Sequence, residues 1–256
     1  MDSDMTKNNE KSQQDLKLDV LAFSAHPDDI ELAAAGTLVK LTKQGYAVGI
    51  ADMTRGELGT RGTREIRQVE AQEAAKLMGA KIRECLDIPD GGVRVSQENI
   101  MKVIKLLRKY RPAIVFNHYW RARHPDHTQT SQIVTEACYL SGLAKIETGQ
   151  ERFRPKRILY HQILSDVVPS FLVDVSAENE QKWKVVKAHK SQFHDPKSKD
   201  PETILSDPYF LENVETKMKY LGTLIGVRHA EGFLTNEPFA LPDLVQVFGD
   251  KQAILR

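Results

Sequence analysis

The chain has 256 residues, of which 41% are hydrophobic and 28% charged, a length and composition that fit one large globular domain. Its 36 Lys and Arg nearly balance its 35 Asp and Glu, so charge gives no indication of a nucleic-acid-binding face or a polybasic membrane patch. No apolar run approaches the ~20 residues of a membrane span. Two distant cysteines, Cys85 and Cys138, favour reduced thiols over a disulfide.

The first 16 residues are polar and lack the apolar core of a secretory signal. We expect residues 1–16 to be a disordered extension and residues 17–256 to form a single domain. A cytoplasmic location follows from the absence of a targeting signal and from the cysteine usage.

Short apolar runs alternate with segments of helical periodicity over the first part of the chain. The expected strands are 19–25, 47–53, 82–88 and 113–118, and the expected helices are 30–44, 63–79 and 96–109. This alternation predicts an α/β fold in which a mostly parallel, Rossmann-like sheet carries helices on both faces.

The alternation of strand and helix patterns becomes less regular after residue 145. Residues 157–163 and 171–175 are predicted strands that could extend the sheet, and 177–192 and 209–226 are predicted helices. The polar, proline-rich segment 193–208 between these helices is a long loop that we expect to lie over a site.

Two clusters of histidine and aspartate follow strands of the predicted sheet. HPDD (26–29) comes after the first strand, and HPDH (124–127) comes after the fourth. Because ligands of open parallel sheets bind beyond the carboxyl ends of the strands, both clusters should meet at one edge. A catalytic metal site needs three His or carboxylate ligands and one open position. His26, Asp29 and one histidine of the second cluster would supply them.

Each tetrapeptide has a second interpretation as the start of a helix. Pro27 suits the first helical position, and acidic residues suit the first turn; HPDH could likewise cap a helix over 128–141. The occurrence of both at matching strand ends favours the metal site. A dinucleotide cofactor is disfavoured, because Gly36 is the only glycine between residues 18 and 44 and no G-x-G-x-x-G turn exists there.

These motifs resemble those of a known family. AHPDDIELAAAGTL (25–38) resembles the signature of the LmbE-like, PIG-L-type de-N-acetylases, and residues 54–80 and HPDH resemble the second and third blocks of that family. LDIPDG (86–91) and AEGF (230–233) resemble the branch that deacetylates N-acetylglucosaminyl-malate in bacillithiol biosynthesis. One departure is the run Ala33, Ala34 and Ala35, where relatives often carry glycines.

The resemblance implies roles for six residues of the two clusters. His26, Asp29 and His127 would bind one divalent cation, with Zn²⁺ expected and Fe²⁺ also suited to the ligand set. Asp28 would be the general base for a metal-activated water. A protonated His124 would stabilise the oxyanion, and Asp126 would orient that imidazole.

Three further residues are candidates for substrate binding. Arg67 matches a family arginine that contacts substrate, although a solvated helix face is the alternative interpretation. Glu57 and Asp90 are candidates for sugar hydroxyls, and each is equally an ordinary loop acid. His118 is interpreted as a satisfied strand-end histidine and not as a fourth ligand.

The resemblance therefore implies a metal-dependent N-deacetylase that acts on a small amino-sugar conjugate, with N-acetylglucosaminyl-malate as the expected substrate and a homo-oligomer as the expected assembly. One alternative is the same chemistry on an inositol-linked or oligosaccharide conjugate. Another is a metal-binding protein without catalysis. The spare acid Asp28 beside Asp29 disfavours it, because storage of a metal needs ligands but no additional base.

Overall fold

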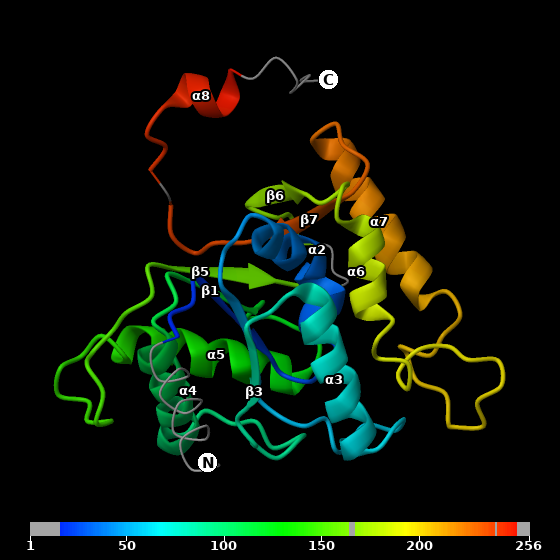
Figure 1. Cartoon of the computed structure of the whole chain (residues 1–256), viewed down its shortest axis with the longest axis horizontal. Helices are drawn as coiled ribbons and strands as arrows, with labels where there is room; N and C mark the ends of the chain where they lie inside the picture. The colour runs from blue at the N-terminus through cyan, green and yellow to red at the C-terminus, as the bar shows by residue number, and fades with distance from the viewer. Residues whose placement is uncertain (1–15, 164–166, 239, 250–256) are drawn as a thin grey trace, which may run out of the picture.

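The central element of the fold is a five-stranded sheet in the order β3-β2-β1-β4-β5, with every neighbouring pair parallel. The structure is a computed structural model that describes residues 16–163, 167–238 and 240–249 (Figure 1), so the expected extension at 1–16 lies almost wholly outside the described residues. The strands are β1 Val20–Ser24, β2 Val48–Asp52, β3 Ile82–Cys85, β4 Ile114–His118, β5 Arg157–His161, β6 Phe171–Asp174 and β7 Ala230–Phe233. The helices are α2 Asp29–Lys43, α3 Arg64–Met78, α4 Gln97–Tyr110, α5 Pro125–Leu140, α6 Asn179–Val186, α7 Phe210–Leu224 and α8 Leu244–Phe248.

Helices cover both faces of this sheet, as the sequence predicts. Alternate residues of β1 divide between two apolar cores: Leu21 and Phe23 join the core under α4 and α5, whereas Val20 and Ala22 join the core under α2 and α3. A strand that is buried on both faces reads as a continuous apolar run, which is why VLAFS shows no alternation. The Rossmann-like, mostly parallel single-domain fold is confirmed.

Helix α3 begins and ends where its sequence indicates. The Thr63 side chain accepts a hydrogen bond from the Ile66 amide at the N-terminus, and Gly79 ends the helix with a φ of 81°. That left-handed conformation favours glycine at the residue after a helix. These two ends fix the position of Arg67 in the first turn, beside the carboxyl edge of the sheet.

The strand expected over residues 171–175 does form, as β6 over Phe171–Asp174, but the expectation that it extends the central sheet was wrong. β5 does extend the central sheet, parallel to β4, but β6 pairs antiparallel with β7 in a separate two-stranded sheet. A parallel strand needs a crossover connection of about a dozen residues or more, and residues 162–170 are too few for one. The helix expected over 177–192 is also shorter and ends at Val186.

β6, β7, α6 and α7 form a second layer over α2 (Figure 1). A third apolar cluster joins this layer to α2, and it includes Leu32 of α2, Val175 after β6, Val186 of α6 and Met218 of α7. The N-terminal half of α2 is therefore enclosed between the central sheet and the second layer. None of the helices in the described ranges is long and apolar enough to span a membrane.

A buried ionic network ties α2 to the sheet behind its first turn. The Arg83 guanidinium of β3 donates to both carboxylate oxygens of Asp52 at 2.7 and 2.9 Å and to the Ala71 carbonyl at 3.1 Å. It also pairs with Glu31 of α2. Because unpaired buried charges are costly, this network fixes the register of α2 against β2 and β3.

Candidate metal centre

The turn between β1 and α2 carries the HPDD cluster and has an unusual backbone. Asp28 is the residue before α2 and has a φ of 111° and a ψ of −28°. A non-glycine residue in this region stores of order 1–3 kcal/mol of strain, which the surroundings must offset. The turn is held by the Ala25 amide, which donates to His118 Nε2 at 2.9 Å, and by the His26 amide, which donates to Asp29 Oδ2 at 2.8 Å.

Asp29 is the point where the two His/Asp clusters meet. Its Oδ2 lies 3.4 Å from His26 Nδ1, and its Oδ1 lies 3.1 Å from His127 Nε2. Ring nitrogens of His26 and His127 also lie within 4.8 Å of each other. The segments that follow β1 and β4, including the first turns of α2 and α5, thus bring together the three residues that the sequence nominates as metal ligands.

The spacing between Asp29 and each histidine fits a divalent cation, with Oδ2 of Asp29 facing His26 and Oδ1 facing His127. Among the described residues, the groups whose ligand atoms all lie within 4.8 Å of one another are His26 with His124 and His127, Asp29 with His118 and His127, and His26 with Asp90 and Asp126. Ligands at about 2.1 Å from a tetrahedral Zn²⁺ lie about 3.4 Å from one another, close to the separations between Asp29 and the two histidines. Imidazole nitrogen and carboxylate oxygen are also the ligand types that Zn²⁺ and Fe²⁺ accept. His118 does not join the set through Nε2, because that atom accepts the Ala25 amide, as expected for a satisfied strand-end histidine.

Asp28 lies apart from this set and pairs with Arg67. Arg67 Nη2 donates to Asp28 Oδ2 at 3.0 Å, and both side chains are almost fully buried. Burial raises the pKa of Asp28 to about 6, against the opposing effect of the Arg67 charge. A carboxyl group that titrates near neutral pH is suited to accept and release a proton.

Arg67 is therefore not a solvated helix residue. Its guanidinium also donates to the carbonyls of Gly56 at 2.8 Å and Pro27 at 2.7 Å, so three of its five N–H groups are committed to the protein. It lines the cavity described below, but its described contacts make it first a partner of Asp28.

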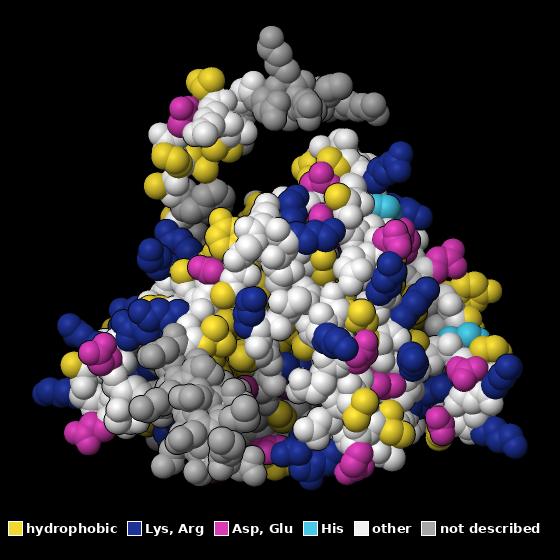
Figure 2. Space-filling view, viewed as in Figure 1, with side chains coloured by type: hydrophobic (Ala, Val, Ile, Leu, Met, Phe, Trp, Pro, Cys, Tyr) yellow, Lys and Arg dark blue, Asp and Glu magenta, His cyan; other side chains and the backbone are white. Residues whose placement is uncertain are grey.

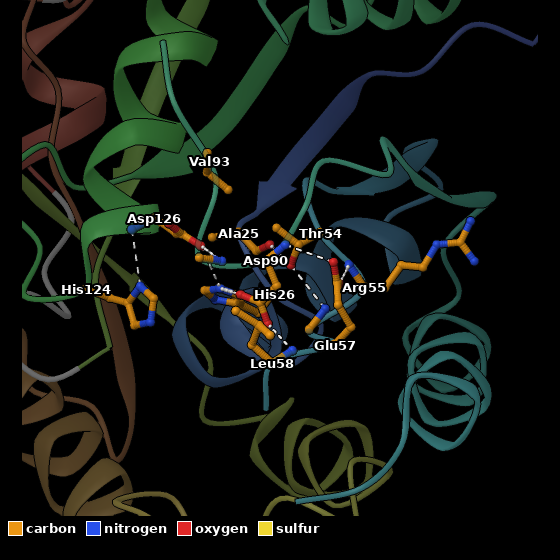
Figure 3. Close-up of polar contacts among 12 residues, drawn as sticks. Ala25, His26, Thr54, Arg55, Glu57, Leu58, Asp90, Val93, His124 and Asp126 are labelled. Atoms are coloured by element: carbon orange, nitrogen blue, oxygen red, sulfur yellow. Dashed lines mark hydrogen bonds and ion pairs between the residues drawn. The ribbon is translucent and has the colours of Figure 1, made fainter. Parts of the chain in front are cut away.

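His26 is held from its other side by two carboxylates (Figure 3). Its Nε2 lies 3.0 Å from Asp90 Oδ1 and 3.4 Å from Asp126 Oδ2. Burial lowers the pKa of His26, but the hydrogen bonds to Asp126, Asp29 and Asp90 outweigh burial and raise it well above the ordinary value. A metal-binding imidazole commonly donates its second N–H to a carboxylate, and His26 has this arrangement.

The contact expected between the Asp126 carboxylate and His124 is replaced by another. The Asp126 amide, not its carboxylate, donates to His124 Nδ1 at 3.2 Å (Figure 3), because His124 is the N-cap of α5. The Asp126 carboxylate instead accepts the Gly91 amide at 2.8 Å and faces His26. With Nδ1 accepting that amide, the ring is placed to carry a proton on Nε2, and burial and the neighbouring His26 lower the pKa of His124. Both features oppose a doubly protonated His124, and its role as oxyanion stabiliser stays a prediction.

Glu57 and Asp90 organise the loops around His26. Glu57 Oε1 accepts the Asp90 amide at 2.9 Å and Oε2 accepts the Arg55 amide at 3.2 Å, while Asp90 Oδ2 accepts the Leu58 amide at 2.9 Å (Figure 3). Asp90 lines the cavity, but Glu57 is not among the described residues that do. The carboxylate of Glu57 is directed at backbone, so a sugar-binding role for it has no support in its contacts.

A cavity of about 970 Å³ opens over the cluster. Its wall includes Thr203, Ile204 and Leu205, so the expected loop 193–208 does contribute to the site. Sequence reasoning missed Arg121 and Arg123, which also line the cavity. Within the described part of the chain, neither arginine side chain has a hydrogen bond or an ion pair. Their position directly before HPDH was the available signal.

Comparison with known proteins agrees with this fold and centre. The family described as PIG-L: GlcNAc-PI de-N-acetylase matches residues 21–138. The chain is 30% identical over 227 residues to the diacetylchitobiose deacetylase of Thermococcus kodakarensis, covering 83% of this chain and 81% of that protein. It is 27% identical to a probable N-acetyl-alpha-D-glucosaminyl L-malate deacetylase 2 of Bacillus anthracis, covering 68% and 81%.

Among solved structures, the conserved protein TT1542 from Thermus thermophilus matches with a TM-score of 0.80 and 37% identity, covering 88% of this chain and 98% of that one. Fold, motifs and relatives together define a hydrolase that acts on a linear amide. The chain belongs to the PIG-L, LmbE-like family of de-N-acetylases, which confirms the resemblance seen in the sequence.

His161, at the end of β5, provides a test of the electrostatics beneath the cluster. It is fully buried, and burial lowers its pKa to about 4. Because the unfolded chain binds a proton near pH 6.5 and the folded chain does not, stability is retained above pH 6.5 and lost as the pH falls towards 4. We expect His161 to account for a loss of about 2 kcal/mol in the free energy of unfolding between pH 7 and pH 5.

Urea denaturation of cation-free protein at pH 7 and pH 5 measures this loss of unfolding free energy. In His161→Gln the loss should be smaller than in the wild type by about 2 kcal/mol. The exposed His194 serves as control, and His194→Gln should follow the wild type. Equal losses in His161→Gln and the wild type would contradict the prediction.

Proposed function

We propose that the chain is a metal-dependent N-deacetylase that removes the acetyl group of an N-acetylglucosaminyl conjugate, with N-acetylglucosaminyl-malate as its substrate. The observation that carries the proposal is the meeting of His26, Asp29 and His127 at one edge of the sheet, with the separate, Arg67-paired acid Asp28 beside them. A site that only binds a metal needs His26, Asp29 and His127, whereas hydrolysis also needs a base such as Asp28.

His26, Asp29 and His127 would hold the cation, for which we propose Zn²⁺, with Fe²⁺ as the second choice. When bound there, it would polarise the acetamide carbonyl and lower the pKa of water to about 7. Asp28 takes the proton from the attacking water and passes it to the departing nitrogen. His124 donates from Nε2 to the developing oxyanion, while its Nδ1 stays fixed by the Asp126 amide. Asp90 and Asp126 hold the His26 ring in one orientation.

The malate assignment is supported by the two arginines of the cavity wall. Arg121 and Arg123 are exposed and have no carboxylate partner among the described residues, and guanidinium groups grip carboxylates in a bidentate manner. Arg67, the residue that the resemblance nominates for this task, is largely committed to Asp28 and two carbonyls. An anionic aglycone is therefore better placed at Arg121 and Arg123.

An oligosaccharide or inositol-linked conjugate is the second candidate. A cavity of about 970 Å³ lies at the upper end of the range for small-ligand sites and leaves room for a larger neutral substrate. Sensitivity of turnover to the two arginines separates the candidates.

The first test is the release of free amine by Zn²⁺- or Fe²⁺-reconstituted protein, beside a chelated control, from N-acetylglucosaminyl-malate and from N,N'-diacetylchitobiose. We expect Arg121→Ala/Arg123→Ala to raise KM for the malate conjugate at least tenfold, the loss of one charge-assisted hydrogen bond, and to leave the neutral substrate within about threefold. Arg152→Ala, at an exposed arginine outside the cavity wall, is the control. Malate turnover that is insensitive to the double variant would shift the assignment to the neutral conjugate.

Asp28→Asn tests the mechanism against a protein that only binds metal. We expect turnover to fall by roughly 10²–10⁴, the usual contribution of a general base, because an amide cannot accept the proton. The Zn²⁺ content per chain, measured by atomic emission, should stay near that of the wild type, since Asp28 is not among the three ligands. An Asp28→Asn protein with full activity would refute the assigned role.

We also propose a cytoplasmic, self-associating protein. Cys85 and Cys138 are free thiols, which suits a reducing compartment. Hydrophobic side chains gather along the arm that carries α8 (Figure 2), where Leu244 and Val245 are exposed, and such patches favour association. Sedimentation should give a mass well above the 29.0 kDa chain, and a monomer at micromolar concentration would contradict the expectation.

A further inference from the structure

A buried ion pair contacts α2 about one turn after the two catalytic carboxylates. Lys182 of α6 and Glu231 of β7 lie 2.7 Å apart (Nζ to Oε1), with side chains 0% and 2% exposed. Neither side chain lines the active-site cavity, and Glu231 belongs to the AEGF motif, which the proposed mechanism leaves without a role.

The pair binds backbone groups of α2 that lie one helical turn apart. Lys182 Nζ donates to the Leu32 carbonyl at 2.8 Å, and Glu231 accepts the Gly36 amide at 2.9 Å and the Thr37 amide at 2.7 Å. In a regular helix the Leu32 carbonyl and the Gly36 amide are each other's partners. Lys182 and Glu231 thus contact both members of one helical hydrogen bond, as side chains do where they intrude on a helix.

Gly36 makes this close approach feasible. A Cβ atom at residue 36 would lie 2.9 Å from Glu231 Oε1 and 2.9 Å from the Cβ of Val175, closer than such atoms approach. Glycine costs roughly 1 kcal/mol in a helix interior relative to alanine. Its presence here is explained by the space that the carboxylate of Glu231 needs.

A buried ion pair is a poor choice for stability alone, because well-packed apolar residues of similar size often stabilise as well. Its charges and directed hydrogen bonds instead fix the position of the backbone they bind. The segment fixed here begins with Asp28, whose positive φ stores strain that neighbouring contacts must offset.

We propose that the Lys182–Glu231 pair positions the first turn of α2, and with it Asp28 and Asp29, for cation binding and proton transfer. The proposal rests on the proposed function, because it concerns that same site. Lys182 and Glu231 are positioning residues that act through the backbone of residues 32–37 and touch neither substrate nor cation.

The double variant Lys182→Met/Glu231→Met tests this, because methionine offers neither a charge nor an oxygen acceptor. The two methionines leave no unpaired ion in the core and no side-chain competitor for the helical bond between the Gly36 amide and the Leu32 carbonyl, so the fold should persist. We expect Zn²⁺ affinity, measured by competition with a chromophoric chelator, to fall 10–100-fold, the range seen when residues supporting metal ligands are removed. We expect kcat to fall by a similar factor while KM stays within about threefold.

Two further variants sharpen the result. Lys43→Met removes a pair that joins the same two helices at the far end of α2, where Lys43 Nζ lies 3.4 Å from Glu178 Oε1; it should leave Zn²⁺ affinity and kcat unchanged. Gly36→Ala raises helix propensity but displaces Glu231, and it should weaken Zn²⁺ binding in the same direction as the double variant. Circular dichroism and thermal unfolding establish that each variant is folded at the assay temperature.

Wild-type Zn²⁺ affinity and kcat in the folded double variant would overturn the positioning role, as would an equal loss in Lys43→Met. If the wild-type protein binds Zn²⁺ and turns over substrate, such results overturn this inference alone. A wild-type protein that neither binds Zn²⁺ nor releases amine would overturn the proposed function, and the positioning role with it.

Discussion

The rest of the site depends on the burial of two adjacent carboxylates at the end of β1. The side chains of Asp28 and Asp29 are each 6% exposed, and carboxylates withdrawn from water are unstable as anions unless they are paired. The surroundings meet this constraint with separate partners. Arg67 reaches Asp28 from α3, whereas His26 reaches Asp29 from the turn after β1 and His127 from the first turn of α5.

The parallel sheet makes this division of partners feasible. Because all its strands end at the same edge, groups that are almost a hundred residues apart in sequence meet there, as His118 of β4 does with the Ala25 amide. The second layer, built from β6, β7, α6 and α7, then closes over α2 from the opposite side. Its contribution is indirect, since it binds the helix that carries the carboxylates and not the carboxylates themselves.

Much of this arrangement could be predicted from the sequence, because strand ends and ligand types are local properties. The convergence of HPDD and HPDH needed only the positions of β1 and β4. The partner of Asp28 could not be predicted, since Arg67 stands beside charged neighbours that suggest a solvated face. Its burial depends on contacts with the loop carrying Gly56 and with the turn carrying Pro27 and Asp28. The direction of the Asp126 carboxylate was also beyond prediction. It depends on His124 capping α5, which turns the Asp126 amide towards His124 and its carboxylate towards His26. Likewise, nothing local to FLVDV distinguishes a strand of the central sheet from one of a separate sheet; the short preceding connection does.

The environments of Asp28 and Asp29 shift the pKa values of these two carboxylates in opposite directions. Burial alone would raise the pKa of both. For Asp28, burial prevails over the single guanidinium of Arg67, and the pKa rises. For Asp29, His127 and His26 outweigh burial, and the pKa falls well below the ordinary value. Neighbouring acids whose environments drive their pKa values apart are suited to different tasks. The one that stays ionised is suited to hold a cation, and the one that titrates near neutral pH is suited to carry a proton. The charges that each carboxylate faces therefore agree with the roles proposed for Asp28 and Asp29.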